Sequence, residues 1–438
     1  MATVEHHAPT SVIVRPAGLP EDLSAPWNIG KLRRTWGIAA GILIAISVIG
    51  FILALNAKDP HLEKTAFMRA YLVGFMWCLG GSLGCLAALM IQHVTGGKWG
   101  LVMRRLFEAG SRNLWFSAVL FIPLAIACKS LVMFYPWNWF DGMTLHGQHS
   151  TTVRIKYLNF DFWLGRAIFF FAAWGVLTWI LNRWSTLQDH KFESFDAYEK
   201  LRLRFMRLSG FGLVFYSVTI TLASIDWVMS LDAVWYSTIY GMIYMVGQTL
   251  SAMAFCLIIL IALAKQEPFR SILRKTELHD NGKLLLAFVM LFTYLSFSQF
   301  IIIWSANLTE EIPWYIARVR NGWKPIIITI FLIHFAVPFL LLLNRNLKKQ
   351  GPQLAKVCLL LLFARVLELY WEVVPNFGDA AWRTGTLAQG FRWTDIVVPL
   401  AMISAWTALF MWELAKRPIL PAYHRLVPEI LEKSHGAH

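Results

Sequence analysis

Ten apolar runs of about 20 residues or more constrain the fold of this 438-residue chain more than any other feature. Hydrophobic residues make up 57% of the sequence, which is well above the usual share in a soluble domain. A helix of about 20 apolar residues is long enough to cross a bilayer. We therefore predict an all-α polytopic membrane protein with transmembrane helices near residues 36–56, 67–92, 114–134, 163–182, 208–229, 234–264, 284–306, 324–344, 353–374 and 393–415.

The polar segments at the two ends of the chain divide it into three parts. We predict an N-terminal tail at 1–34, a ten-span membrane domain at 35–416 and a C-terminal tail at 417–438. Residues 1–30 lack the apolar core of a cleavable signal peptide. The first apolar run is therefore expected to remain in the protein as its first span.

Basic residues are concentrated between alternate spans. If both tails lie in the cytoplasm, 26 of the 40 lysines and arginines fall on the inner side and 10 on the outer side. This asymmetry follows the positive-inside rule and predicts that both termini are cytoplasmic. The net charge of +14 is then mostly a topology signal, and it does not indicate nucleic-acid binding.

Two charged residues share one face of the ninth span. Arg365 and Glu368 are three residues apart near its middle, so their side chains can partly neutralise one another. One interpretation is a structural ion pair, because buried charges persist when they are paired. The other is a proton relay, because carboxylates and histidines inside membranes commonly carry protons.

His334 lies near the middle of the eighth span. It is either a hydrogen-bonded packing residue or a second proton carrier. On the seventh span Tyr294, Ser298 and Gln299 supply hydroxyl and amide groups that can connect such carriers through water. The same groups also serve as contacts between helices. We list all four residues as proton-path candidates and leave both interpretations open.

Asp226, at the outer end of the fifth span, is a candidate for the outer exit of a proton path or for a structural contact. Asp232 follows in a short outer turn, where solvation or capping of the next helix accounts for it. Secondary candidates, all near the outer ends of spans, are Lys129, Arg166 and Asp395.

Residue types that bind redox cofactors or perform catalysis are not grouped in this sequence. His334 is the one histidine at depth, with His93 at the inner end of the second span, so paired haem ligands are not predicted. The five cysteines lie in apolar runs and form no CxxC pair. No phosphate loop or catalytic triad is evident. We expect no catalytic residue, no metal and no cofactor bound by this chain, apart from a quinone or lipid contact.

Four segments together resemble one known family. They are GGKWGLVMRRLFEAGSRNLWFSAVLFIPL (96–124), RIKYLNFDFWLGRAIFFFAAWGVLTW (154–179), SIDWVMSLDAVWYSTIYGM (224–242) and NLTEEIPWYIARV (307–319). The chain resembles, over nearly its whole length, the second NrfD-like (polysulfide-reductase-type) membrane subunit of bacterial alternative complex III, a quinol:cytochrome c oxidoreductase.

The resemblance implies a bacterial cytoplasmic membrane location and two four-helix bundles, spans two to five and six to nine, flanked by spans one and ten. It implies partners: a sister ten-span quinol-binding subunit, an iron–sulfur subunit on the outer face, c-type cytochrome subunits, small membrane subunits and a terminal oxidase. The complex oxidises menaquinol or ubiquinol, and its iron–sulfur clusters and c-type haems lie in the partners. For this chain the resemblance implies a proton-conducting path and a scaffold for the redox subunits.

Two alternatives from other classes remain. A secondary transporter places its site at mid-membrane, often on helices broken by Gly or Pro at matching positions of two halves. Here Pro338 and the glycines of the second span do not occupy matching positions. A purely structural anchor subunit is the second alternative, in which the buried charges only fix the packing of the helices.

Overall fold

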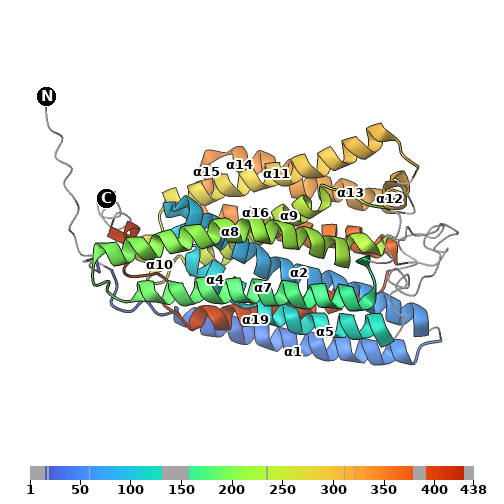
Figure 1. Cartoon of the computed structure of the whole chain (residues 1–438), viewed down its shortest axis with the longest axis horizontal. Helices are drawn as coiled ribbons and strands as arrows, with labels where there is room; N and C mark the ends of the chain where they lie inside the picture. The colour runs from blue at the N-terminus through green and yellow to red at the C-terminus, as the bar shows by residue number, and fades with distance from the viewer. Residues whose placement is uncertain are drawn as a thin grey trace.

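Long helices lie side by side along one axis of the molecule and form a bundle (Figure 1). The computed structural model describes residues 15–16, 19–58, 60–130, 157–232, 235–309, 311–320, 322–377 and 391–428. Within these ranges the regular structure is helical and contains no β-strand. The predicted all-α membrane class is confirmed.

The long helices follow the predicted order of spans. They are α1 (Trp27–Leu55), α2 (Pro60–Thr95), α5 (Leu114–Ser130), α7 (Phe160–Thr186), α8 (Phe195–Trp227), α9 (Tyr240–Leu263), α11 (Lys275–Ala306), α16 (Gly351–Val373) and α19 (Thr394–Ala415). The eighth span consists of three consecutive segments, α13 (Lys324–Ile330), η5 (Phe331–Ala336) and α14 (Val337–Leu343). Short helices complete the described chain: α3 (Lys98–Leu101), α4 (Arg104–Arg112), η3 (Leu187–Asp189), η4 (Met229–Leu231), α10 (Phe269–Ile272), α12 (Ile312–Ala317), α15 (Arg345–Lys349) and η6 (Val374–Asn376).

In the part of the chain that the structure describes, nine helical segments are long and apolar enough to cross a membrane. The remaining predicted span is α16, whose 23 residues are also sufficient in length. Its composition is less apolar because it carries Arg365, Glu368 and Glu372 on a buried face. Each of the ten predicted spans therefore corresponds to a helical segment.

Helix α2 occupies the centre of the bundle and is buried over almost all of its membrane-spanning length. It contacts α4, α5 and α8 as well as α9, α16, α1 and α19. Further contacts join α5 to α7 and α7 to α8. Helices α9 and α14 each contact both α11 and α16, and α1 packs along α19. These contacts agree with the two predicted four-helix groups and their flanking helices.

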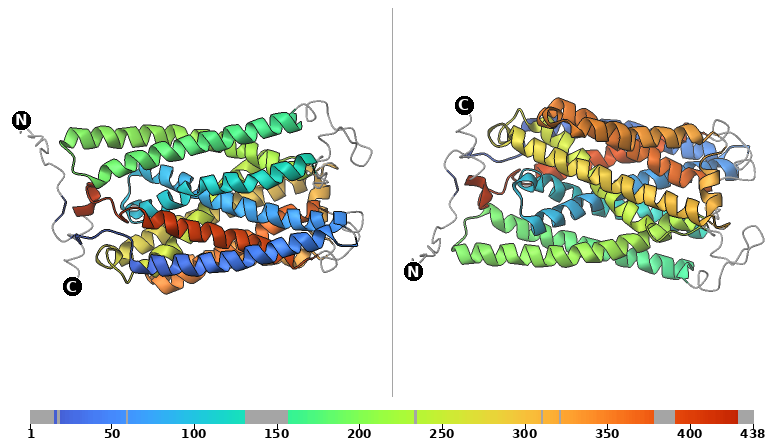
Figure 2. Two further views of the ribbon diagram at one scale, coloured as in Figure 1. Left: turned by 90° about the horizontal axis from the view of Figure 1, so that it is seen from below. Right: turned by 90° about the horizontal axis from the view of Figure 1, so that it is seen from above.

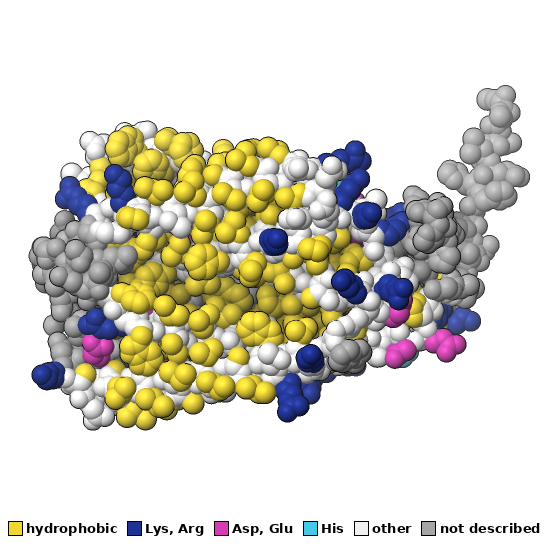
Figure 3. Space-filling view, turned by 180° about the vertical axis from the view of Figure 1, so that it is seen from behind, with side chains coloured by type: hydrophobic (Ala, Val, Ile, Leu, Met, Phe, Trp, Pro, Cys, Tyr) yellow, Lys and Arg dark blue, Asp and Glu magenta, His cyan; other side chains and the backbone are white. Residues whose placement is uncertain are grey.

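The surface carries a broad hydrophobic band, with lysines and arginines gathered toward its ends (Figure 3). Large hydrophobic side chains that are more than half exposed add to the apolar surface of the described residues, among them Ile168, Phe211, Val214 and Leu340. An apolar surface of this extent is suited to lipid rather than water. Helix α1 begins and α19 ends at the same end of the bundle (Figure 2), which we call the tail end. The opposite end is the distal end.

Several helix starts differ from the prediction. Helices α1, α2, α8 and α11 begin seven or more residues before the predicted spans, and α9 begins after its predicted start. Helix α8 begins at Phe195 rather than 208, because Ser194 Oγ accepts a hydrogen bond from the Ala197 backbone N–H at 3.2 Å. Much of the basic segment at 183–207, which lies between the fourth and fifth predicted spans, is thus helical. Helix α9 begins at Tyr240 rather than 234. Asp232 Oδ1 accepts a hydrogen bond from the Trp235 N–H at 3.1 Å, ahead of the start of the helix.

Candidate functional site

Helix α16 places three charged side chains on one buried face. Arg365, Glu368 and Glu372 are only 2%, 4% and 5% exposed. Spacings of three, four and seven residues put them on the same side of a helix. Arg365 Nη1 lies 2.8 Å from Glu368 Oε2, so the predicted ion pair is present.

His334 joins this pair from a π-helical turn in the eighth span, η5. Pro338 has no backbone N–H, so it cannot donate to the carbonyl four residues earlier, which is that of His334. A missing bond of this kind favours a wider turn, and π turns are frequent at functional sites. The buried His334 side chain places Nδ1 3.5 Å from Glu368 Oε2. We call Arg365, Glu368 and His334 the mid-membrane cluster.

The hydrogen-bonding capacity of the mid-membrane cluster is largely unused. Among the described residues, both Nη atoms of Arg365, Oε2 of Glu368 and Nδ1 of His334 lack a hydrogen-bond partner, because their close contacts miss hydrogen-bond geometry. Buried groups of this kind are usually satisfied by protein or by ordered water. A carboxylate and an imidazole this close can each hold a proton, so the cluster is chemically suited to passing one.

Helices α16 and α9 approach one another closely beside the mid-membrane cluster, at the junction of the two four-helix groups. A Cβ at Gly247 on α9 would lie 2.7 Å from Arg365 Nη1, so the guanidinium packs directly against the backbone of α9 at this glycine. Beyond it lies a cavity of about 10 Å³, lined by Arg365 and Gln248 among others. This is close to the smallest volume that admits one water molecule. Gln248 Oε1 accepts a hydrogen bond from the Tyr216 hydroxyl of α8 at 2.8 Å.

At the distal end, Arg318 covers the end of α16. Its side chain is 1% exposed and donates to the Glu372 carbonyl and to Asn376 Oδ1, both at 2.8 Å. The guanidinium carbon lies 3.7 Å from the centroid of the Trp314 ring. Burial lowers the pKa of Arg318 to about 10, so it still carries its charge at neutral pH.

The three candidates on the seventh span do not join the mid-membrane cluster. Tyr294 is 67% exposed on the outer surface of α11. Ser298 is half-buried on the same helix. Gln299 accepts a hydrogen bond from Ser237 Oγ at 2.8 Å and donates to the Tyr315 hydroxyl at 3.2 Å, near the distal end. The polar group that approaches the cluster comes instead from α9, where Gln248 lines the same small cavity as Arg365.

Asp226 is tied to Arg166 by a bidentate pair. Arg166 Nε and Nη2 donate to the two carboxylate oxygens at 2.7 and 2.8 Å. Arg166 Nη1 also donates to the Tyr157 carbonyl, and the Trp163 indole donates to the Asp226 carbonyl. This complete bonding favours the structural alternative for both residues.

Asp395 makes a similar pair with a residue that the sequence does not single out. Arg69 Nε and Nη2 donate to its two oxygens at 3.0 and 2.6 Å, joining α2 to α19 across 326 residues of chain. Lys129 belongs to α5, and its side chain lies outside what the structure describes. The paired carboxylates near the distal end therefore fasten neighbouring helices together.

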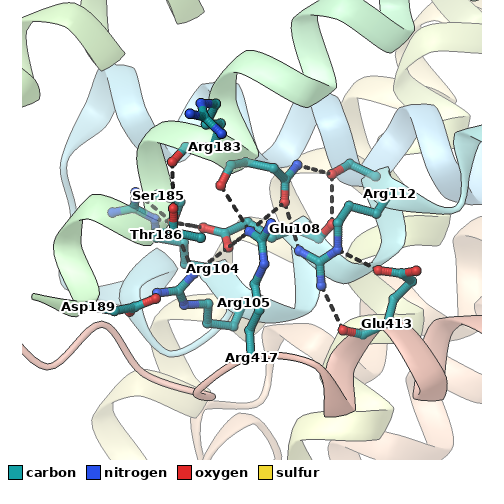
Figure 4. A network of polar contacts seen from close by, with 12 residues as sticks. Arg104, Arg105, Glu108, Arg112, Arg183, Ser185, Thr186, Asp189, Glu413 and Arg417 are labelled. Atoms are coloured by element: carbon teal, nitrogen blue, oxygen red, sulfur yellow. Dashed lines mark hydrogen bonds and ion pairs between the residues drawn. The ribbon is translucent and has the colours of Figure 1, made fainter.

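A second charged network lies at the tail end of the bundle (Figure 4). Glu108 of α4 is fully buried; it accepts hydrogen bonds from Arg105 Nη1 at 2.8 Å and Arg104 Nε at 3.2 Å. Ser185 of α7 donates to Glu108 Oε1 at 2.5 Å, the oxygen that also accepts from Arg104, and Arg105 also pairs with Asp189. We call these residues the tail-end network. Arg104 and Arg105 lie between two predicted spans and were not among the predicted site residues. The signal for the network in the sequence is Glu108, which follows them by four and three residues.

The network continues to α19 through Arg112. Arg112 Nε donates to Glu413 Oε2 at 2.7 Å and Nη1 donates to Asn182 Oδ1 at 2.8 Å. Lys416 also binds Glu413, at 2.6 Å, and Arg417 Nη1 donates to the Asn182 carbonyl at 2.9 Å. These contacts join helices α4, α7 and α19 at the tail end of the bundle.

A cavity of about 260 Å³ opens beside the tail-end network. Its wall includes His93 and Gln92 of α2, Arg104, and His424 of the segment that follows α19. Among the described residues, Nε2 of His93 and Oε1 of Gln92 have no hydrogen-bond partner. The cavity is large enough for several waters, and these buried polar atoms give water a reason to enter it.

No family model matches the chain, and no curated protein is significantly similar to it in sequence. The family resemblance of the four quoted segments accordingly stays a prediction. The geometry of the two charged regions is what a functional proposal can use.

Proposed function

We propose that the chain is an integral membrane subunit of a quinol-oxidising electron-transfer complex, alternative complex III, in which it supplies a transmembrane proton path. The mid-membrane cluster is the single observation that supports this most. Charges at this depth cost a few kcal/mol each, and this cluster keeps donors and acceptors without hydrogen-bond partners. A structural role gains nothing from unmet bonding, whereas a relay needs groups that can exchange partners.

In this proposal the tail end faces the cytoplasm of a bacterium and protons enter through the cavity beside His93. Ser209, seven residues before Tyr216 on α8, is fully buried and its hydroxyl has no partner among the described residues. Waters beside Ser209 would lead to Tyr216 and Gln248, and from there to the mid-membrane cluster. Glu368 and His334 then hold the proton in turn, with Arg365 fixing the position of the carboxylate.

The electron-transfer chemistry belongs to the partners in this proposal. The sister ten-span subunit binds quinol, and the iron–sulfur and c-type cytochrome subunits carry the electrons. The paired carboxylates at Asp226 and Asp395 give the chain a rigid frame on which such partners can assemble.

The test is purification of the protein from its native membrane in mild detergent, followed by haem-stained electrophoresis and a quinol to cytochrome c activity assay. We expect co-migration with c-haem and iron–sulfur subunits and quinol-dependent turnover. Isolation as a lone, colourless protein would contradict the proposal and favour a secondary transporter.

A further inference from the structure

A large hollow lies on the surface near the tail end, between α5, α7 and α19. Its volume is about 620 Å³, and its wall runs from Arg183 and Arg417 past Trp179 and Gly175 to Phe171. Gly175 and Phe171 are 8 and 12 residues from Arg183 on α7. At 1.5 Å per residue they lie roughly 12 and 18 Å deeper in the bundle.

The tail-end rim of this hollow carries an excess of positive charge. Arg112 and Lys416 together neutralise Glu413, the acidic residue of the wall. Arg183 has no ion-pair partner among the described residues, and its guanidinium lies 5.9 Å from the Trp179 ring centroid. Figure 4 shows its side chain directed away from the tail-end network.

Arg417 is the second available cation of the rim. Its nearest carboxylate is Glu108 at 3.9 Å, which is already bound by two other arginines. Burial lowers the pKa of Arg417, and the positive charge of Arg112 lowers it further. An anion beside Arg183 and Arg417 would relieve this repulsion.

The deeper wall is apolar and open. Trp115 and Trp179 are 48% and 62% exposed, at the level where aromatic side chains meet lipid headgroups. A Cβ at Gly175 would meet no atom within 4 Å, so the glycine leaves a smooth channel along α7. A cationic rim above an apolar channel matches a molecule with an anionic head and a long hydrocarbon chain.

We propose that this hollow is a binding site for an anionic phospholipid, with the phosphate at Arg183 and Arg417 and an acyl chain along Gly175 and Phe171. Basic pockets between transmembrane helices bind such headgroups. The site does not depend on the proposed proton path or on the redox partners. Charge complementarity at the rim distinguishes it from a site for a neutral lipid or for an apolar partner helix.

The experiment is native mass spectrometry of the delipidated full-length protein with added phosphatidylglycerol, phosphatidylcholine or inorganic phosphate. The variants Arg183→Gln and Gly175→Leu are compared with two controls. Arg207→Gln removes an exposed arginine from α8 at the same end, and Gly165→Leu adds a side chain on α7 where a Cβ also meets no atom within 4 Å.

We expect wild type to bind phosphatidylglycerol at least about tenfold more tightly than phosphatidylcholine, which corresponds to about 1.4 kcal/mol. Arg183→Gln and Gly175→Leu should each lose most of that preference, while both controls keep it and all four variants keep the wild-type melting temperature without lipid. Equal binding of the two lipids, equal losses in variants and controls, or full competition by inorganic phosphate would each overturn the proposal.

Discussion

The tail-end network and the mid-membrane cluster both place a carboxylate beside arginine in a buried position, yet their bonding differs. Glu108 receives hydrogen bonds from two arginines and a serine. Glu368 lies 2.8 Å from Arg365 and 3.5 Å from His334, and its Oε2 has no hydrogen-bond partner among the described residues. The same residue types thus form a network whose carboxylate is saturated with hydrogen bonds in one place, and a cluster whose carboxylate is unsaturated in the other.

This difference separates two uses of buried charge. A saturated network holds its charges fixed, because any change of protonation breaks several bonds at once. An unsaturated cluster loses little when one proton moves, and water can complete its bonding in either state. The extent of hydrogen bonding, rather than burial, therefore distinguishes a structural contact between helices from a candidate proton relay.

The largest expected effect is on stability at the tail-end network. Glu108→Ala removes the carboxylate that Arg104 and Arg105 share and leaves both cations buried. We expect a loss of about 3–5 kcal/mol in the free energy of unfolding, measured by denaturant titration in detergent. A Glu108→Ala variant with wild-type stability would show that the tail-end network does not stabilise the packing of the helices.

The next effect concerns the pair between Arg166 and Asp226. Either Arg166→Met or Asp226→Leu alone leaves one buried charge without its partner and should cost about 3 kcal/mol. The double variant removes both charges and should be closer to wild type than either single variant. The free energies of unfolding of wild type, the two single variants and the double variant give the coupling energy of the pair. If the losses of the single variants add up in the double variant, a structural pair is contradicted.

The sequence predicted the part of the fold that depends on local composition. Apolar runs locate helices because lipid offers no hydrogen-bond partners, so the backbone N–H and C=O groups of each span must bond within the helix. Spacing within one helix also predicted the contact of Arg365 with Glu368. The start of α8 was missed because the apolar window marks where lipid begins, whereas the cap at Ser194 marks where the helix begins.

Contacts between helices were not predictable in this way. The partner of Asp395 is Arg69, 326 residues away, and no local pattern links them. The contact of His334 with Glu368 depends on a π turn and on the packing of two spans. Gly247 likewise matters only because Arg365 packs against it. The candidate residues were visible in sequence, but their partners required the fold.

A smaller effect is expected from pH at the cavity beside the tail-end network. Burial, followed by the charges of Arg104 and Arg425, lowers the pKa of His424 to about 3. Below its ordinary pKa of about 6.5 the unfolded chain binds a proton that the folded protein does not, so stability falls as pH falls from there. We expect a loss of about 2 kcal/mol at pH 5, because pH 5 lies about 1.5 units below the ordinary pKa and each unit corresponds to about 1.4 kcal/mol.

The measurement is thermal unfolding at pH 7.5 and pH 5 of wild type and His424→Gln. Other groups titrate in both proteins, so the informative quantity is the difference between their two shifts. The variant should be less sensitive to pH than wild type. Equal sensitivity would mean that His424 is protonated in the folded protein.

The smallest effect on stability is expected at the mid-membrane cluster. Glu368→Gln leaves Arg365 with a second carboxylate, Glu372, on the same face of α16, and the amide has nearly the same shape. We expect a loss below about 1 kcal/mol in the same denaturant titration. A loss as large as that of Glu108→Ala would remove the distinction between the two regions.

The most direct test of the central claim is the number of protons moved per electron by the intact assembly in proteoliposomes during quinol oxidation. Glu368→Gln is compared with wild type and with Glu199→Gln, a control in an exposed ion pair with Arg202. We predict that Glu368→Gln lowers this ratio while electron transfer and subunit composition persist, and that the control is unchanged. A wild-type ratio in an intact Glu368→Gln assembly would contradict the proposed relay.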